Sequence, residues 1–531
     1  MSKYIFISSG VCSSLGKGVA AAAIGSLLES SGLSVTLVKC DPYINLDAAN
    51  MDPYQQGEVY VTDDGSETDS DIGTFARFTS FTPARDHSIT IGQIYESVIQ
   101  NERAGRYNGR TVQVIPHITD EIKRRILNAG MRSGPDVVIV EIGGTVGDIE
   151  SIPFLEAARQ LIRLLGHSNA ITIHLTLIPM LTGGEMKTKP TQHSVKKMQE
   201  IGIQPDILLC RSELPLDSSL YRKIALFCNV NPDAVFSTVD VEQSIYELPV
   251  LFHKQRVDKR ILARLGFPEA RTNIRPWTTF LNRLVNPKRR VTIALVSKNT
   301  RIDDCYKSLR EALLHAAVTT HNAELNLRKV DAEKLEHSDV AAAFSGVDGI
   351  VVPNNFGQRG FLGLLAAVRY ARQNRVPFLG IDLGMQLMAI ETARSLLNWE
   401  DADSTEFVRE TSHPVISLPE EQSGLASSGS FKIGLSAIAL DKQSKLYYIY
   451  KRVPMVSERH RSRYAFDRRF QEDITAKGLR ITAFAQDNQT EAFEWEEHPW
   501  GIGVQYHPEF SSRPSKPHPV FSAFVGAALG V

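Results

Sequence analysis

The chain has 531 residues, of which 43% are hydrophobic and 22% charged, and its formal net charge is −1. This length predicts two or three domains, and the charge favours no nucleic-acid or membrane-surface partner. No apolar run reaches the roughly 18–20 residues that span a bilayer, and the N-terminus enters a strand-like stretch rather than a signal peptide. We therefore expect a cytoplasmic protein that binds neither nucleic acid nor membrane.

Short apolar runs alternate with helical patterns over the first half of the chain. They predict strands at 4–8, 35–38, 136–141, 170–178 and 206–209, with a glycine-rich turn at 10–18 and a helix at 19–30. Strands that are apolar throughout and separated by helices predict a parallel sheet with helices on both faces.

The pattern weakens at 266–290, where prolines and a basic cluster predict a linker. A second set of strands follows at 291–296, 349–352, 378–381, 481–485 and 502–506. The predicted fold class is α/β, with two domains at 1–265 and 291–531. Each is expected to be a mainly parallel sheet flanked by helices.

The five cysteines are sparse and irregularly spaced. They fit no metal-binding pair, and an odd number does not suggest a disulfide framework, so reduced thiols are expected. No cysteine follows Cys305.

The stretch SSGVCSSLGKG at 8–18 lies between a predicted strand and a predicted helix. Backbone N–H groups in such a turn form an anion site, and Lys17 could reach terminal phosphates. The loop departs from the usual P-loop, because five residues separate Gly10 from Gly16 and Gly18 stands where a serine or threonine would bind magnesium. Any metal must therefore be held elsewhere, and a glycine-rich turn without a ligand is the alternative.

This loop and KCDPYIN at 39–45 resemble the opening of the CTP synthases. The likeness covers most of 1–265, through GEVYVTDDGSETDSDIG (57–73), TVQVIPHITDEIK (111–123), VEIGGTVGDIES (140–151), KTKPTQHSVK (187–196) and ALFCNV (225–230). The resemblance implies a ligase that phosphorylates UTP at O4 with ATP, after which ammonia displaces the phosphate to give CTP. It also implies Mg²⁺, a homotetramer and feedback inhibition by CTP.

The resemblance assigns roles to residues that match the family's motifs. Lys17 and Lys39 would be catalytic, and Asp71 and Glu141 would bind magnesium. The ATP site would comprise Ser14, Leu15, Gly16, Lys17, Gly18, Val19, Asp71, Asp240 and Val241. The UTP or CTP site would comprise Ser13, Asp148, Ile149, Glu150, Lys187, Thr188, Lys189, Pro190, Thr191, Gln192 and Lys223.

The residues themselves support these roles unequally. Glu141 ends a buried apolar run, where a lone carboxylate is costly and where ligands of open α/β sheets bind. Asp71 alone could be a solvated charge, and the lysines at 187 and 189 could belong to an ordinary charged loop, although they suit a polyanion. Gln56 and Val239 depart from residues common in the family, His and Lys respectively.

Residues 291–531 resemble a class I glutamine amidotransferase domain, which implies a Cys–His–Glu triad with its nucleophile on a sharp strand-to-helix turn. That turn is FLGIDLGMQ at 378–386, where Asp382 takes the position of the cysteine. The other triad members are present, but two asparagines replace the glycines of the oxyanion segment at 353–360. The matching residues of this degenerate site are Asp382, His507, Glu509, Asn354, Asn355, Gln386, Glu406 and Arg463.

A carboxylate that attacked an amide would form a high-energy anhydride, whereas a thiolate is a far better nucleophile toward an acyl carbon. We therefore expect amination of UTP with free ammonia and no glutaminase activity. Two alternatives remain: the same chemistry on another pyrimidine nucleotide, or a non-catalytic regulator that co-assembles with an active CTP synthase. The C-terminal domain could also retain glutamine binding without hydrolysis.

Overall fold

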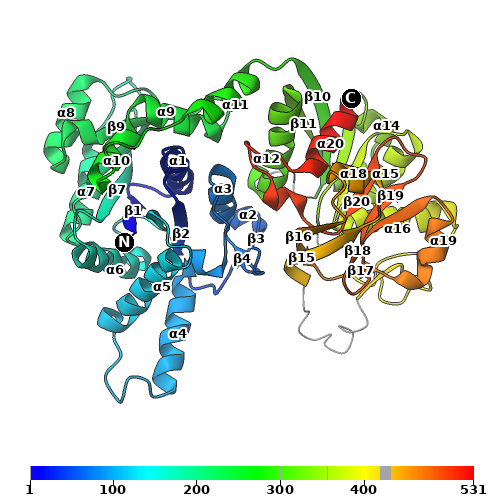
Figure 1. Ribbon diagram of the computed structural model, residues 1–531, viewed down its shortest axis with the longest axis horizontal. Coiled ribbons are helices and arrows are strands. Elements are labelled where there is room, and N and C mark those ends of the chain that lie inside the picture. The colour runs from blue at the N-terminus through cyan, green and yellow to red at the C-terminus, as the bar shows by residue number, and fades with distance from the viewer. Residues whose placement is uncertain (1, 299, 301, 356, 419–431) are drawn as a thin grey trace. The chain divides into compact units, whose positions relative to one another are not determined.

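The computed structural model describes residues 2–298, 300, 302–355, 357–418 and 432–531, which form two compact units (Figure 1). The first unit comprises Met1–Asn50 and Thr68–Leu281, and the second comprises Met51–Glu67 and Asn282–Val531. The short excursion 51–67 therefore belongs to the second unit, although the chain on both sides of it belongs to the first. Nothing in the sequence pattern predicted this excursion.

The first unit is built on a seven-stranded sheet in the order β5-β2-β6-β1-β7-β8-β9. All of its neighbouring strands are parallel. The strands are β1 (Lys3–Ser9), β2 (Val35–Asp41), β5 (Ser88–Thr90), β6 (Val137–Ile142), β7 (Ala170–Leu177), β8 (Ile207–Ser212) and β9 (Val235–Val239). The apolar runs predicted as buried strands are confirmed, since β2 and β6 are buried along their whole length.

Helices cover this sheet and complete the first unit. They are α1 (Lys17–Glu29), α3 (Ser70–Phe78), α4 (Ile91–Arg103), α5 (Thr119–Met131), α6 (Ile152–Leu165), α7 (Lys189–Glu200), α8 (Ser218–Cys228), α9 (Leu248–Lys254) and α10 (Val257–Leu265). The helix α11 (Arg275–Val285) begins in this unit and ends in the second, which starts at Asn282. Alanines fill the centre of α1, a residue type that forms helices readily and packs closely. The segment predicted as a linker contains α11 and the start of β10.

The second unit contains a nine-stranded mixed sheet in the order β11-β10-β12-β13-β20-β19-β18-β15-β16. Its first five strands are parallel and its last four continue antiparallel. The strands are β10 (Arg289–Ser297), β11 (Ala323–Asp331), β12 (Gly349–Val352), β13 (Phe378–Ile381), β15 (Lys432–Leu440), β16 (Met455–Ser462), β18 (Leu479–Ala485), β19 (Thr490–Trp495) and β20 (Gly501–Val504). The prediction of a mainly parallel sheet holds for the half that carries the candidate site.

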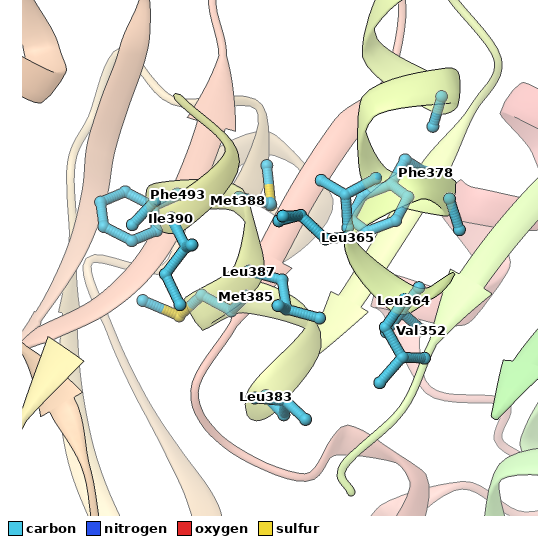
Figure 2. Close-up of a cluster of buried hydrophobic side chains, with 14 of the residues drawn as sticks. Val352, Leu364, Leu365, Phe378, Leu383, Met385, Leu387, Met388, Ile390 and Phe493 are labelled. Atoms are coloured by element: carbon cyan, nitrogen blue, oxygen red, sulfur yellow. The ribbon is translucent and has the colours of Figure 1, made fainter. Parts of the chain in front are cut away.

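The central helix of the second unit is α16 (Leu383–Leu396), whose first eleven residues are all buried. Its apolar side chains pack against α15 (Phe361–Gln373), β12, β13 and β19, as Figure 2 shows for Met385, Leu387 and Phe493. The remaining helices are α2 (Pro53–Gln56), α12 (Lys307–His315), α13 (Ala332–Leu335), α14 (Val340–Ala343), α18 (Lys445–Ile449), α19 (Gln471–Thr475) and α20 (Pro519–Ala528). This packing fixes the start of α16, which directly follows Asp382.

Two further sequence expectations concern the whole chain. None of the five cysteines, all of which lie in the described part, forms a disulfide. Within the same part, no helix combines the length and the apolar character that a bilayer span requires.

Candidate functional site

The first candidate site lies where β1 ends and α1 begins. Ser14 and Gly16 take left-handed backbone conformations, with φ of 59° and 87°, so the loop can turn sharply into the helix. Lys17 is the first residue of α1, and its Nζ donates to Ser9 Oγ (2.9 Å) and to the carbonyl oxygen of Gly144 (2.7 Å). The loop therefore combines a helix N-terminus with a fixed ammonium group, as a phosphate site requires.

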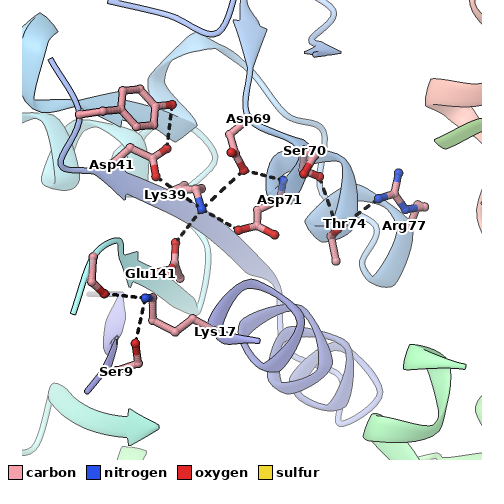
Figure 3. A network of polar contacts seen from close by, with 12 residues as sticks. Ser9, Lys17, Lys39, Asp41, Asp69, Ser70, Asp71, Thr74, Arg77 and Glu141 are labelled. Atoms are coloured by element: carbon pink, nitrogen blue, oxygen red, sulfur yellow. Dashed lines mark hydrogen bonds and ion pairs between the residues drawn. The ribbon is translucent and has the colours of Figure 1, made fainter. Parts of the chain in front are cut away.

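Four carboxylates surround Lys39, which is buried in β2 (Figure 3). Its Nζ lies 2.6 Å from Asp71, 3.3 Å from Glu141, and 3.5 Å from both Asp41 and Asp69. The register of β2 and β6 pairs Lys39 directly with Glu141, so the sheet itself brings these two side chains together. Sequence reasoning found three of these residues and missed Asp41 and Asp69.

Burial and the crowding of like charges dominate the electrostatics of this cluster. Burial raises the pKa of Asp41 to about 8, although Lys39 opposes the shift. Burial also raises the pKa of Glu141, again against Lys39 and Lys17. Burial lowers the pKa of Lys17, which Glu141 partly offsets. Such perturbed groups at the ends of strands are typical of a functional site.

The carboxylate of Asp71 explains the glycine at position 18. A Cβ on Gly18 would lie 2.5 Å from Asp71 Cγ, so a side chain there would force the carboxylate out of its position. The position that holds a magnesium-binding hydroxyl in the usual P-loop is thus covered by a carboxylate, itself a hard oxygen ligand.

The carboxylates of Asp71 and Glu141 fit a magnesium ion. Oε2 of Glu141 is buried without a hydrogen-bond partner among the described residues, and both side chains present oxygen ligands. No cluster of three metal-binding side chains is found in the described part of the chain. Nucleotide phosphates and water would therefore have to complete the coordination shell, as is usual for Mg²⁺.

Arg211 links two of the predicted ATP residues. Its Nε donates to Asp240 Oδ1 (2.7 Å) and its Nη1 donates to the carbonyl oxygen of Ser14 (3.2 Å). Arg211 lies near the end of β8, beside Thr238 in the register of β9. Sequence reasoning missed this residue, and its only signal was an arginine near the carboxyl end of a buried strand.

The residues predicted to bind UTP or CTP fall into two groups. Thr188, Thr191 and Gln192 are buried, and their side chains bond within the fold, as in the bond from Gln192 Nε2 to Thr188 Oγ1 (3.0 Å). They can position the segment more readily than contact a ligand. The other group is more accessible and comprises Ser13, Asp148, Ile149, Glu150, Lys187, Lys189, Pro190 and Lys223. Lys187 pairs with Glu185 at 2.6 Å, and this bond together with the charges of Lys187 and Lys223 lowers the pKa of that carboxyl.

The second candidate site lies at the turn from β13 into α16. Asp382 has φ of 51° and ψ of −104°, a strained conformation for a residue with a side chain. Gly380 and Gly384 permit it, since a Cβ on Gly384 would lie 2.1 Å from the carbonyl oxygen of Val352. The turn therefore has the geometry of a nucleophile elbow.

The carboxyl of Asp382 is 4% exposed and accepts a hydrogen bond from Gln505 Nε2. Burial raises its pKa to about 7, although nearby His507 opposes the shift. Gln386, one turn into α16, donates to the carbonyl oxygen of Tyr464 (3.0 Å). Gln505 was missed in the sequence, where an amide beside the histidine loop carried no signal.

The other two triad positions remain coupled. His507 Nδ1 lies 2.7 Å from Glu509 Oε1. Burial disfavours the charged imidazole, but Glu509 outweighs it and raises the pKa of His507. Glu509 is therefore placed to orient the imidazole of His507, as an acid does in a triad.

The segment that carries Asn354 and Asn355 is held by its side chains. Asn355 Oδ1 accepts from the Tyr306 hydroxyl (2.7 Å), and its Nδ2 donates to the carbonyl oxygen of Pro353 (3.1 Å). Neither asparagine has a positive φ. Their backbone is therefore free of the strain that only glycine would relieve, although their side chains occupy space that glycines would leave open.

Glu406 and Lys298 meet at Gly357 in the same segment. The amide of Gly357 donates to Glu406 Oε1 (3.0 Å), and the carbonyl oxygen of Gly357 accepts from Lys298 Nζ. Burial lowers the pKa of Lys298 to about 8, against the attraction of Glu406. Burial raises the pKa of Glu406. The charges of Lys298 and Arg463, which lie nearby, partly oppose this rise.

The excursion 51–67 forms one wall of this second site. Its Tyr60 hydroxyl donates to the carbonyl oxygen of Phe510 (3.0 Å), and Arg461 Nε donates to Glu67 Oε1 (2.7 Å). A cavity of about 120 Å³ lies beside it, lined by Glu58, Val59, Cys305, Tyr306, Leu309, Pro353, Asn354, Asn355, Arg461, His507, Glu509 and Phe510. The histidine loop thus contacts a segment from early in the sequence.

Comparison with known proteins agrees with this two-part organisation. Residues 3–267 match the family model described as CTP synthase N-terminus, and residues 301–527 match glutamine amidotransferase class-I. The CTP synthase of Caldanaerobacter subterraneus subsp. tengcongensis is 48% identical over 100% of this chain and 99% of its own. That of Syntrophus aciditrophicus is 50% identical over 99% and 98%. A solved glutaminase domain of Trypanosoma brucei CTPS with bound acivicin is 34% identical over 45% of this chain and 94% of its own, with a TM-score of 0.43.

Proposed function

Because the chain belongs to the CTP synthase family, we propose that it converts UTP to CTP with ATP and takes its nitrogen from free ammonia. The first unit would carry out the amination, and the second would be an amidotransferase-like domain without glutaminase activity. The observation that carries the ammonia dependence is Asp382, which stands on the nucleophile elbow where the family has cysteine.

In the first unit, Lys17 would hold the phosphates of ATP at the N-terminus of α1. Lys39 would neutralise charge that develops on the transferred phosphoryl group, since phosphoryl transfer depends chiefly on positioning and charge stabilisation. Asp71 and Glu141 would hold a magnesium ion, which when bound supplies positive charge that offsets the charge of the phosphates. Ammonia would then displace phosphate from C4 of the phosphorylated UTP.

In the second unit, the acid–base pair of His507 and Glu509 is present, but the elbow carries Asp382 and no thiol for the imidazole to activate. The carboxyl of Asp382 is turned toward Gln505, and its raised pKa leaves it partly protonated near neutral pH. A protonated carboxyl is no nucleophile, and attack by its carboxylate would give an anhydride. GTP, which activates glutamine hydrolysis in the family, would have no step to accelerate here.

The test is CTP formation from UTP, ATP and Mg²⁺ with ammonium chloride or glutamine supplied separately. We expect product with ammonium and none with glutamine above the background. Product with glutamine would contradict the loss of the glutaminase. No product with either donor would favour another pyrimidine nucleotide as substrate, or a regulatory role in complex with an active synthase. We expect a homotetramer whichever of these outcomes is found.

A further inference from the structure

The cavity beside His507 contains more hydrogen-bond acceptors than the protein satisfies. Three of its lining residues have a buried acceptor atom without a hydrogen-bond partner among the described residues: His507 Nε2, Glu509 Oε2 and Asn354 Oδ1. His507 and Glu509 are only 2% and 8% exposed. Each buried acceptor left without a donor costs about 1–3 kcal/mol, and native proteins satisfy nearly all such atoms. Three in one cavity therefore indicate a ligand.

The imidazole of His507 presents an acceptor in its neutral form. A carboxylate can only accept, so the 2.7 Å contact with Glu509 places the hydrogen on Nδ1 and leaves a lone pair on Nε2. All three unsatisfied atoms thus require donors. A water molecule has two donors, whereas an ammonium ion has four and no acceptor.

The charges around the cavity also favour a small cation. Glu509 and Glu58 line it, and Asp382 lies close enough to His507 to influence its pKa. Glu58 accepts from the amide of Ser308 (2.8 Å), which holds it in place. The one guanidinium on the wall, Arg461, is paired with Glu67. Burial raises the pKa of the Cys305 thiol, which is therefore neutral at pH 7.

The size of the cavity fits this ligand. Its volume of about 120 Å³ exceeds the roughly 10–15 Å³ that a single water-sized molecule needs by the same measure. An ammonium ion and accompanying water molecules can therefore occupy it together.

We propose that this cavity captures ammonium and that His507 Nε2 removes one proton from it to release ammonia. In this step an N–H bond of ammonium breaks, an N–H bond to Nε2 forms, and the electron pair stays on the departing NH3. The imidazolium is stabilised by Glu509 and later returns its proton to solvent. Removal of the ion from water favours the neutral form of the nitrogen. This inference rests on the proposed use of free ammonia, for which it supplies the collecting site.

The first test is the pH dependence of the KM for total ammonium between pH 7 and 8.5. If the enzyme took NH3 directly from solution, this KM would fall about tenfold per pH unit, because NH3 is the minor form there. Capture of ammonium by the neutral imidazole predicts a KM that falls only while His507 loses its own proton and levels off before pH 8.5. A tenfold fall per pH unit that continues to pH 8.5 would overturn the proposal.

The second test removes one acceptor with little change in volume. Asn354→Leu should raise the KM for ammonium at least tenfold and leave the KM for UTP unchanged. His507→Phe should do the same and abolish any remaining pH effect of the imidazole. Asn326→Leu is the control, because Asn326 bonds to Thr292 in β10 of the same unit and lies outside the cavity. An unchanged KM for ammonium in Asn354→Leu would overturn the proposal.

A binding measurement separates this inference from the proposed function. Ammonium chloride titrated calorimetrically into the full chain, against potassium chloride at equal ionic strength, should give a saturable heat that Asn354→Leu abolishes. Absence of that heat would mean that the cavity holds ordered water only. Binding without CTP formation would preserve the site and refute the ammonia-dependent synthase.

Discussion

Replacing Lys39 with methionine removes the one cation at the centre of the carboxylate cluster. Its Nζ lies within 3.5 Å of Asp41, Asp69, Asp71 and Glu141. Loss of one partner from a buried ion pair costs about 3–5 kcal/mol, because the other charge stays buried. Asp71 is partly solvated, but the side chains of Asp41 and Glu141 are 7% and 1% exposed. We therefore expect Lys39→Met to lose about 3–5 kcal/mol of unfolding free energy at pH 8, and to lose CTP formation.

The size of this loss should depend on pH in a defined direction. The pKa of Asp41 is raised to about 8 in the folded chain. Binding of this proton therefore contributes to the unfolding free energy at low pH, and the contribution is lost as pH rises through the folded pKa. Over that window the unfolding free energy should fall by about 1.4 kcal/mol per pH unit for this one group. Without Lys39 the folded pKa rises further, so the variant should be much less destabilised at pH 6 than at pH 8.5. Magnesium should restore part of the stability.

Amide hydrogen exchange in β2 and β6 measures the relevant opening free energy, because it follows this sheet rather than the whole two-unit chain. Lys197→Met is the matched control. Lys197 pairs with Glu200 at 2.8 Å on the surface, where the side chains are about 60% exposed, and such pairs contribute about 0–1 kcal/mol. Equal losses in the two variants, or a loss at Lys39 that does not change with pH, would refute the account of the cluster.

Three further predictions follow from single contacts. Asp382→Cys should restore measurable CTP formation with glutamine, because His507 is still paired with Glu509. The rate should be about 100-fold below that with ammonium, since the altered oxyanion segment loses about 3 kcal/mol of transition-state stabilisation. Absence of glutamine-dependent product would show that the domain has lost more than its nucleophile. Gly18→Ala should raise the KM for ATP at least tenfold without unfolding the protein by circular dichroism, because its Cβ displaces Asp71; an unchanged KM would argue against Asp71 as the metal ligand. Arg211→Ala should raise the KM for ATP and leave the KM for UTP unchanged, with partial recovery in Arg211→Lys; equal effects on both would mean that Arg211 supports the fold rather than the ATP site.

The parallel sheets were predictable because burial on both faces leaves continuous apolar runs, as in β6 and β7. The phosphate loop and the elbow were predictable because their glycines, lysine and neighbouring motifs lie close together in sequence. The antiparallel strands β15 and β16 were not predicted. Their mixture of buried, half-buried and exposed residues gives a weaker signal than a buried run.

The residues that were missed act through contacts between distant parts of the chain. Asp41 joins the cluster because β2 lies beside β6, and Gln505 reaches Asp382 because β20 lies beside β13. The excursion 51–67 was missed for the same reason: Tyr60 bonds to a carbonyl 450 residues away. Local composition carries no record of such pairings, so only the three-dimensional fold reveals them.

The elbow and the cavity beside it give different kinds of evidence about the second unit. The strained backbone at Asp382 costs about 1–3 kcal/mol, but the close packing of Gly384 on Val352 and the buried core around α16 impose it whether or not a nucleophile is present. Its persistence therefore says nothing about glutamine hydrolysis. The three unsatisfied acceptors are not imposed by packing in this way. Asn354 Oδ1 makes no hydrogen bond among the described residues, so an apolar residue of the same size could replace Asn354 without losing one there. A chain that had simply lost its glutaminase would be expected to replace such atoms, so their presence favours continued use of the cavity by a ligand that donates hydrogen bonds.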